Sequence, residues 1–305
     1  MLVLETKDLT KKYKSQVVVN NVNMHVHEGD IYGFVGENGA GKTTIIRLVS
    51  GLIKPNSGSY SLFETNYKDK KIFEARKKVS GIVESVSINR SMDALANLKL
   101  QCYVTNTKKS DEELIELLNE VGLDYKEIQK KRSGNFSLGM RQRLGLAMAM
   151  VSNPSFILLD EPMNGLDPKG FIDFREAVER LHQKGVTFLI SSHILSELDK
   201  ICTRIGFISR GVLLDEIEIN ELRHKARRKI MVDSDDISSL AELLIKDLKI
   251  KESNIDGKKL FIYDDMDINK VINYLVKKDI KVNNVGVIQD TIEDYYLSLM
   301  RKTIQ

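Results

Sequence analysis

The segment 36–44 sets the strongest restriction on the fold of this chain. It reads Gly-Glu-Asn-Gly-Ala-Gly-Lys-Thr-Thr and fits the pattern G-x-x-x-x-G-K-[ST] at every fixed position. Glycines let successive backbone N–H groups turn toward phosphate oxygens, while Lys42 and the dipole of a following helix add positive potential. The hydroxyl of Thr43 would ligate Mg²⁺. The segment therefore predicts a nucleoside triphosphate site made by Gly36, Glu37, Asn38, Gly39, Ala40, Gly41, Lys42, Thr43 and Thr44.

The residues on either side of this loop predict a strand that enters it and a helix that leaves it. Residues 30–35 read as a buried strand, and residues 44–49 have the pattern of a helix. A glycine-rich turn alone is often an ordinary loop. The strand, the helix and Lys42 together favour a phosphate loop in an α/β fold.

A second block, residues 156–162, places two carboxylates at the end of an apolar run. Phe-Ile-Leu-Leu followed by Asp160 and Glu161 is the pattern of a buried central strand whose C-terminal edge faces a ligand. Asp160 is predicted to hold Mg²⁺. Glu161, one residue further, is predicted to orient and deprotonate the water that attacks the γ-phosphate. The alternative is an acidic pair that caps a loop.

Between these blocks, residues 135–143 read Asn-Phe-Ser-Leu-Gly-Met-Arg-Gln-Arg and precede an apolar helix at 144–151. A serine that opens a helix is an ordinary N-cap when it stands alone. Placed just before the Asp160 strand, this block resembles the LSGGQ signature of the ATP-binding cassette family. Ser137 and Gly139 keep the serine and the second glycine of that signature. The block departs from it at three positions, Phe136, Leu138 and Met140.

Further segments follow the motif order of the same family. Residues 164–167 resemble its D-loop, which assigns Asp167 to the nucleotide site. His193 follows a second apolar strand at 187–190 and resembles the switch histidine, a donor to the γ-phosphate. A lone histidine at a strand end is more often structural. Tyr13 matches the aromatic residue that stacks on adenine in this family.

Glu84 stands where most members of the family carry a glutamine that contacts the metal shell and the transmembrane partner. A carboxylate changes the charge there, and the resemblance still assigns Glu84 to the nucleotide and metal site. This glutamate, the Ser-Leu-Gly-Met signature and the short chain are similar to the ATPase subunits of lantibiotic self-protection and bacitracin-type export systems. The alternative is a solvated loop carboxylate that has lost the role of the glutamine.

The resemblance covers about residues 1–215 and implies a P-loop NTPase of the cassette type. Its parts would be an α/β core sheet, an antiparallel β portion near the nucleotide, and a helical subdomain at about 85–150 that carries the signature. Residues 112–121 have helical spacing that ends at Gly122, in agreement with that subdomain. Residues 216–305 are predicted to form a separate, small α+β domain.

This C-terminal part is predicted to have the order β-α-β-β-α-β of a ferredoxin-like fold. The predicted elements are strands at 229–232, near 250, at 260–263 and at 280–288, and helices at 237–248 and 268–277. A last helix is expected to begin at Thr291, whose hydroxyl would cap it three residues before Asp294. A passive stabilising role is the simplest expectation, with dimer contact and regulation as alternatives.

The composition argues against several classes of function. With 46 Lys and Arg against 43 Asp and Glu, the net charge of +3 provides no strong field for nucleic acid or anionic lipid. The basic run at 223–229 is expected to be a solvated linker or helix end rather than a binding patch. Cys102 and Cys202 lack metal-like spacing and are expected to be apolar fillers in a reducing compartment. No secretory leader or run of about 20 apolar residues is found, which predicts a cytoplasmic protein.

The resemblance implies an ATPase that works as a dimer, with each ATP held between the phosphate loop of one subunit and the signature of another. Lys42, Glu161 and His193 are the predicted catalytic residues. The expected partners are a second copy of the chain and a separate membrane permease, contacted around residues 84–98. The permease would export an antimicrobial peptide or other toxic compound and would hold the chain at the cytoplasmic face of the membrane.

Two other functions are compatible with a phosphate loop. A soluble cassette ATPase that acts on ribosomes or DNA normally has two cassettes in one chain or a long coiled coil, and the sequence has neither. A phosphate-loop kinase or GTPase would leave the block around Ser137 unexplained, and the sequence lacks the guanine-reading Asn-Lys-x-Asp motif.

Overall fold

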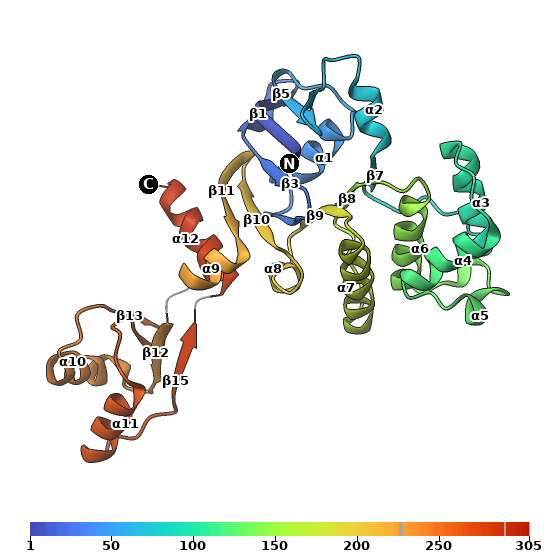
Figure 1. The fold of residues 1–305 in the computed structure, drawn as a ribbon. Helices are drawn as coiled ribbons and strands as arrows, with labels where there is room; N and C mark the ends of the chain where they lie inside the picture. The colour runs from blue at the N-terminus through green and yellow to red at the C-terminus, as the bar shows by residue number, and fades with distance from the viewer. Residues whose placement is uncertain (226–227, 290, 305) are drawn as a thin grey trace. The chain divides into compact units, whose positions relative to one another are not determined.

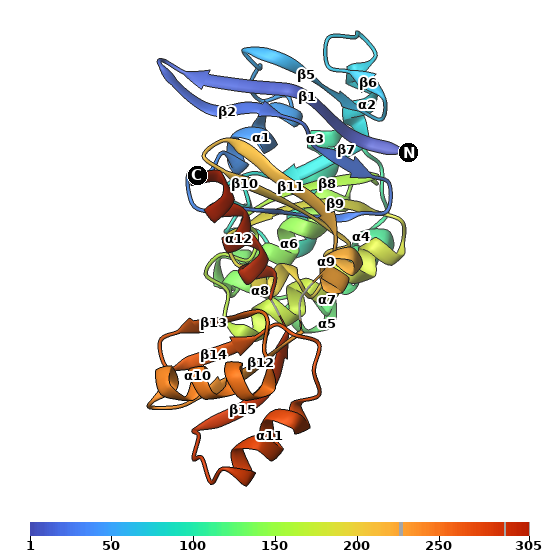
Figure 2. The same cartoon turned by 90° about the vertical axis from the view of Figure 1, so that its left-hand side faces the viewer.

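The computed structural model describes the backbone of residues 1–225, 228–289 and 291–304, and the chain divides into two compact units, Met1–Ile219 and Asn220–Gln305. The predicted boundary between residues 215 and 216 falls inside strand β11 (Val212–Glu218). Because β11 pairs antiparallel with β10 (Arg204–Ser209), the first unit extends to the end of that strand. The two units are described separately, and both are drawn in Figures 1 and 2.

The first unit is built on a six-stranded sheet in the order β11-β10-β4-β9-β8-β7. All neighbours are parallel except β10 and β11. The other four strands are β4 (Ile31–Val35), β9 (Thr187–Ser192), β8 (Phe156–Asp160) and β7 (Val79–Ile82). Strands β4, β8 and β9 are buried at every residue, as expected for apolar runs in a parallel sheet covered on both faces. The three strands predicted around the site are confirmed, and their carboxyl ends lie at one edge of the sheet.

A second, antiparallel sheet contains five strands in the first unit. They are β2 (Gln16–Val22), β1 (Leu2–Tyr13), β5 (Ser57–Leu62) and β6 (Thr65–Asn66) in that order, with β3 (His25–His27) paired to β1. Leu4 and Leu62 of this sheet share one buried core with Ile45 and Leu48 of helix α1 (Lys42–Val49). The predicted antiparallel portion is therefore present and packs beside the helix that follows the phosphate loop.

Helices α3 to α6 gather together as a helical subdomain within the range predicted at 85–150 (Figure 1). Helix α4 begins at a capping box in which Ser110 and Glu113 accept each other's backbone N–H groups, and the chain turns at Gly122 with φ +73°. The helices of the first unit are α1, α2 (Ile72–Lys77), α3 (Ala94–Thr105), α4 (Asp111–Glu120), α5 (Tyr125–Ile128), the short 3₁₀ helix η1 (Ser133–Asn135), α6 (Leu138–Met150), α7 (Pro168–Gln183) and α8 (Leu195–Leu198), and α9 (Ile219–Lys225) begins at its last residue.

The second unit contains an antiparallel sheet in the order β13-β14-β12-β15 and has its own core. Its elements are β12 (Arg228–Asp233), α10 (Ile237–Leu248), β13 (Ser253–Asp256), β14 (Lys259–Ile262), α11 (Ile268–Lys277), β15 (Asn284–Gln289) and α12 (Ile292–Ile304). This is the predicted ferredoxin-like order. Thr291 and Asp294 bond each other's backbone N–H groups at 2.8 and 3.1 Å, which confirms the predicted start of the last helix.

Two predicted strand starts in the second unit are wrong for the same reason. Ile250 follows Lys249 at the end of α10, and Ile280 follows Asp279 after α11; Lys249 and Asp279 both have positive φ. In each case the isoleucine N–H bonds back to the last turn of the helix, at 3.1 Å for Ile250 and 2.9 Å for Ile280. The apolar residue after each helix therefore belongs to a helix cap, and the strands begin later, at Ser253 and Asn284.

Within the residues that the structure describes, none of the helices combines the length and the apolar character that crossing a bilayer requires.

Candidate functional site

The phosphate loop connects the end of β4 to the start of α1, and its glycines are required by its shape. Gly39 and Gly41 have φ values of +84° and +109°, which side chains other than glycine rarely adopt. A Cβ on Gly36 would lie 2.3 Å from the backbone oxygen of Ile208 in β10, so no larger residue fits there without a shift. Lys42 is the first residue of α1. Its ammonium and the partial positive charge of the helix N-terminus therefore both lie at the phosphate loop.

Lys42 is buried, with 5% of its surface exposed. Its Nζ donates to the backbone oxygens of Gly36 at 2.6 Å and Glu37 at 3.1 Å, so the ammonium lies folded over its own loop. The same Nζ lies 3.2 Å from Oε1 of Glu161. This contact joins the phosphate loop to the carboxylates at the end of β8.

The two carboxylates at the end of β8 have different surroundings. Asp160 is 4% exposed and accepts a hydrogen bond from Oγ of Ser191 at 2.7 Å. Glu161 follows with φ +48°, an uncommon conformation for a residue with a side chain that often marks a functional site. Its N–H donates to Oγ of Ser191 at 2.9 Å, which holds the turn in place. The strand end therefore aims one carboxylate inward and the next toward Lys42.

His193 completes the group from the end of β9. Its Nδ1 lies 2.8 Å from Oε2 of Glu161, and its side chain is 34% exposed. Oε1 of Glu161 is buried and has no hydrogen-bond partner within the described part of the chain, although the ammonium of Lys42 lies near it. Glu161 thus stands between a lysine and a histidine, with Oε1 beside the ammonium and Oε2 beside the imidazole.

Strand β9 lies between β4 and β8, and this order explains how the group is assembled. Ser191, the last but one residue of β9, bonds both Asp160 and the backbone of Glu161. Sequence reasoning did not select Ser191, although the polar pair 191–192 before His193 at the end of an apolar strand was a visible signal. The structure therefore joins Asp160 and Glu161 through a serine that the motifs do not name, while Lys42 and His193 contact Glu161 directly.

Thr43, the second residue of α1, is half-buried, and the remaining loop residues lie beside it between β4 and α1. Mg²⁺ prefers oxygen ligands and is commonly held by one or two carboxylates together with substrate phosphates. The hydroxyl of Thr43 and the carboxylate of Asp160 supply this kind of donor. Among the residues described, no cluster of three or more His, Cys, Asp or Glu side chains forms a metal site of its own.

Tyr13 and Glu84 lie on other elements and have partners of their own. Tyr13 ends β1 with 42% of its surface exposed, and Nζ of Lys11 lies 5.4 Å from its ring centroid. Glu84 follows β7 with φ +65° and forms an ion pair with Arg47 near the end of α1. The carboxylate of Glu84 is thus tied to the phosphate-loop helix, a partner that the sequence alone does not reveal.

The signature and D-loop residues occupy two helix N-termini. Ser137 is exposed and accepts the N–H of Met140 at 3.2 Å as the N-cap of α6. Gly139 is buried in the first turn of that helix. Asp167 is exposed and accepts the N–H of Gly170 at 2.9 Å as the N-cap of α7. All these groups belong to the first unit, and the hydrogen bonds that Ser137 and Asp167 accept cap their own helices.

Comparisons with known proteins agree with this arrangement. Residues 19–164 match the family model described as ABC transporter. Among curated proteins, the chain is 37% identical over 302 residues to the bacitracin transport ATP-binding protein BcrA of Bacillus licheniformis, covering 98% of this chain and 97% of that one. It is 38% identical over 223 residues to the lantibiotic transport ATP-binding protein SrtF of Streptococcus pyogenes, covering 71% and 91%.

Solved structures give the same fold. An ATP-binding subunit of an ABC transporter is 27% identical, has a TM-score of 0.63, and is matched over 73% of this chain and 92% of its own. A dimeric ATP-binding cassette in a post-hydrolysis state, bound to ADP and Pi, is 23% identical with a TM-score of 0.62, over 71% and 98%. The second likeness concerns the fold alone.

Proposed function

The chain belongs to the ABC transporter family of ATP-binding proteins, which are ATPases, and from that premise we propose that it drives a separate permease that exports an antimicrobial peptide. The relatives with the printed roles of bacitracin and lantibiotic transport support this cargo class. One of them matches nearly the whole chain, including the second unit. This favours an exporter over a soluble cassette ATPase that acts on ribosomes or DNA.

The observation that carries the catalytic part of the proposal is the contact of Glu161 with both Lys42 and His193. The Nζ–Oε1 distance is 3.2 Å and the Nδ1–Oε2 distance is 2.8 Å. These three side chains come from the phosphate loop and from the ends of two parallel strands. A kinase or GTPase reading of the loop gives no role to the histidine in this group.

We assign ATP to the phosphate loop, with its phosphates on the backbone N–H groups at the start of α1 and on Lys42. Lys42 already has an ammonium directed at two carbonyl oxygens of the loop, at 2.6 and 3.1 Å, and the γ-phosphate would replace them as its partner. Thr43 and Asp160 are the proposed ligands of Mg²⁺. When bound, the metal would neutralise phosphate charge. Tyr13 is proposed to stack on adenine.

In the hydrolysis step, Glu161 accepts a hydrogen bond from the attacking water and takes its proton, which places the carboxylate in the role of general base. The backbone N–H of Glu161 donates to Oγ of Ser191 at 2.9 Å, which fixes the backbone from which the carboxylate extends. His193 donates toward the γ-phosphate and stabilises charge that develops there.

We propose that two copies of the chain close over two ATP molecules. Ser137, Gly139 and Asp167 lie at helix N-termini, which attract anions through the helix dipole, and would face the ATP of the other copy. The chain would then work at the cytoplasmic face of the membrane, bound to its permease around residues 84–98, where Glu84 occupies the position of the usual glutamine.

Replacing Glu161 tests the catalytic assignment. We expect Glu161→Gln to keep ATP affinity within about twofold and to lower the hydrolysis rate about 10²- to 10⁴-fold, because the amide cannot take a proton from water. Lys42→Ala should instead weaken ATP binding about 10- to 100-fold, since it removes a charge-assisted contact. Binding is measured with a fluorescent ATP analogue and hydrolysis by phosphate release.

Glu179→Gln is a matched control for these assays, because Glu179 lies on α7 in an ion pair with Arg175 and outside the site. It should leave both affinity and rate unchanged. Wild-type hydrolysis by Glu161→Gln would overturn the assignment of the base. The exporter is tested separately by extracting membranes from the native cell: copurification of a multi-span protein at near-equal amounts supports the proposal, and ribosomal proteins or DNA in its place contradict it.

A further inference from the structure

The helices that carry Ser137 and Asp167 begin against each other. A Cβ on Gly139 of α6 would lie 3.4 Å from the Cα of Gly170 in α7, so the two backbones approach closely in their first turns. Gly165, in the loop before α7, has φ +75°, and a Cβ there would lie 3.3 Å from Cδ2 of Leu138. The starts of α6 and α7 are therefore packed together by small residues.

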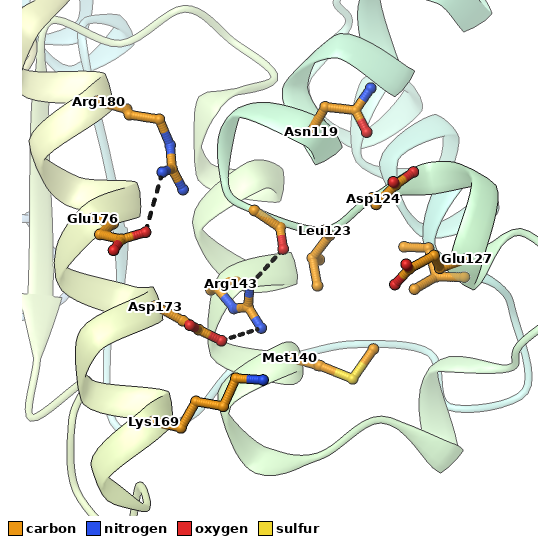
Figure 3. Close-up of a pocket in the computed structure, with 12 residues that line it drawn as sticks. Asn119, Leu123, Asp124, Glu127, Met140, Arg143, Lys169, Asp173, Glu176 and Arg180 are labelled. Carbon is orange, nitrogen blue, oxygen red and sulfur yellow. Dashed lines mark hydrogen bonds and ion pairs between the residues drawn. The ribbon is translucent and has the colours of Figure 1, made fainter.

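One side chain extends this contact along the two helices. Arg143 of α6 places Nη2 3.1 Å from Oδ2 of Asp173 in α7, and the two side chains are only 11% and 27% exposed. The guanidinium also donates through Nη1 to the backbone oxygen of Gly122, just after the end of α4. Arg143 thus connects the signature helix, the helix after the D-loop and the end of a third helix (Figure 3).

A second arginine, Arg180 of α7, contacts the end of the same third helix, α4. Nε of Arg180 donates to the backbone oxygen of Glu120 at 2.6 Å, and its Nη1 lies 3.5 Å from Glu176 on the same helix. Both guanidinium groups surround Gly122, where a Cβ would lie 3.0 Å from Arg143 and 3.1 Å from Arg180. A cavity of about 460 Å³ lies beside these contacts and is lined by residues of α4 to α7 (Figure 3). The polar contacts of the two arginines therefore join these helices beside the cavity.

The contact between α6 and α7 depends on the charge and shape of the Arg143 guanidinium. Burial lowers the pKa of its guanidinium, Asp173 acts in the opposite direction, and the group stays protonated as arginine does in proteins. Both side chains are half-buried, so losing either partner leaves the other charge partly desolvated and without its ion pair. Lysine cannot reproduce the geometry, because an ammonium lacks the planar fork that bonds a carboxylate and a carbonyl at once.

We propose that Arg143 is a positioning residue that fixes α6 to α7, so that the signature and D-loop residues of one subunit reach the ATP of the other together. This rests on the dimer of the proposed function. Within the described part of the chain, the ion pair and hydrogen bond of Arg143 go to Asp173 and Gly122 and not to the phosphate loop or Glu161. It therefore acts on closure of the dimer and not on ATP binding by one subunit.

The first test uses the single subunit and does not depend on the dimer. In the full chain without nucleotide, Arg143→Lys and Asp173→Asn should both speed amide hydrogen exchange in residues 137–142 and 165–170 together, by about tenfold or more. Asp173→Glu keeps the carboxylate and should restore most of the protection. Arg175→Lys is the control, because Arg175 pairs with Glu179 within α7 at 4.0 Å. Unchanged exchange in both segments in Arg143→Lys and Asp173→Asn overturns the proposal.

The second test measures closure in the full chain carrying Glu161→Gln, so that ATP stays intact. Arg143→Lys and Asp173→Asn should raise the ATP concentration needed for dimer formation at least tenfold, measured by analytical ultracentrifugation, while ATP affinity of the single subunit stays within twofold. Dimer formation at the parent concentration of ATP overturns the proposal. If the parent itself fails to dimerise, the proposed function is wrong about the dimer, and the exchange measurement still decides whether Arg143 fixes the two helices.

Discussion

Glu84 is a residue whose chemistry is decided by a neighbour far away in the sequence. Its carboxylate is 59% exposed and pairs with Arg47, which lies near the end of the phosphate-loop helix. An exposed ion pair of this kind contributes about 0–1 kcal/mol to stability. The pair therefore matters for the position that it gives the carboxylate of Glu84 and not for the free energy of unfolding.

We expect Glu84→Gln to leave the free energy of unfolding within about 1 kcal/mol of the wild type. It should raise the Mg²⁺ concentration that gives half-maximal ATPase activity, because the metal shell loses a negative charge. Arg47→Gln is the matched control, since it breaks the same pair and keeps the carboxylate. An unchanged Mg²⁺ dependence in Glu84→Gln would reduce Glu84 to a solvated loop residue.

At the scale of elements, the N-termini of α6 and α4 form a natural comparison. Each is capped by a serine of the helical subdomain, Ser137 for α6 and Ser110 for α4. Only the first is assigned to the nucleotide. Loss of an N-cap hydroxyl costs about 0.5–2 kcal/mol wherever the helix lies, so stability alone does not separate the two serines.

We expect Ser137→Ala and Ser110→Ala to lower the free energy of unfolding by similar amounts, about 1 kcal/mol each, measured by urea denaturation. Only Ser137→Ala should also lower ATPase activity, because its hydroxyl would face the ATP of the second subunit. Equal activity in the two variants would contradict the assignment of Ser137 and leave it as an ordinary cap.

Elements were predictable from the sequence where a local pattern decides the structure. The fixed spacing of residues 36–44 and the apolar runs that become β4, β8 and β9 are of this kind. The starts of β13 and β15 were not, because the helix caps before them use Lys249 and Asp279 at positive φ instead of glycine.

Contacts that depend on strand order or helix packing also could not be predicted from the sequence. Ser191 bonds Asp160 only because β9 pairs with β8, and Arg143 meets Asp173 only because α6 packs on α7. No spacing along the chain records either neighbour. The motifs therefore identified candidate groups, while the side chains that hold those groups in place required the fold.

At the scale of the whole molecule, the chain contains two units with separate cores. The core of the first includes Leu4, Ile45 and Leu158, and the core of the second includes Val232, Leu244 and Val271. All the residues assigned to ATP lie in the first unit. The second unit contributes no group to the proposed chemistry, and its stabilising role stays a prediction.

We expect a chain that ends at residue 219 to fold and to bind a fluorescent ATP analogue within about twofold of the affinity of the full chain. The reason is that the sheet, the phosphate loop and their core are complete without residues 220–305. Glu161→Gln in the shortened chain should again keep binding. A loss of affinity greater than tenfold in a folded protein would show that the second unit takes part in forming the site.

The central place of β9 has a consequence for how this ATPase can change over time. Strand β9 lies between β4, which leads into the phosphate loop, and β8, which ends in the carboxylates. Ser191 at the end of β9 contacts Asp160, and His193 just after it contacts Glu161. A substitution within residues 188–190 that moves the strand would disturb nucleotide affinity and turnover at once. Substitutions that change turnover alone, or nucleotide affinity alone, are therefore expected outside residues 188–190.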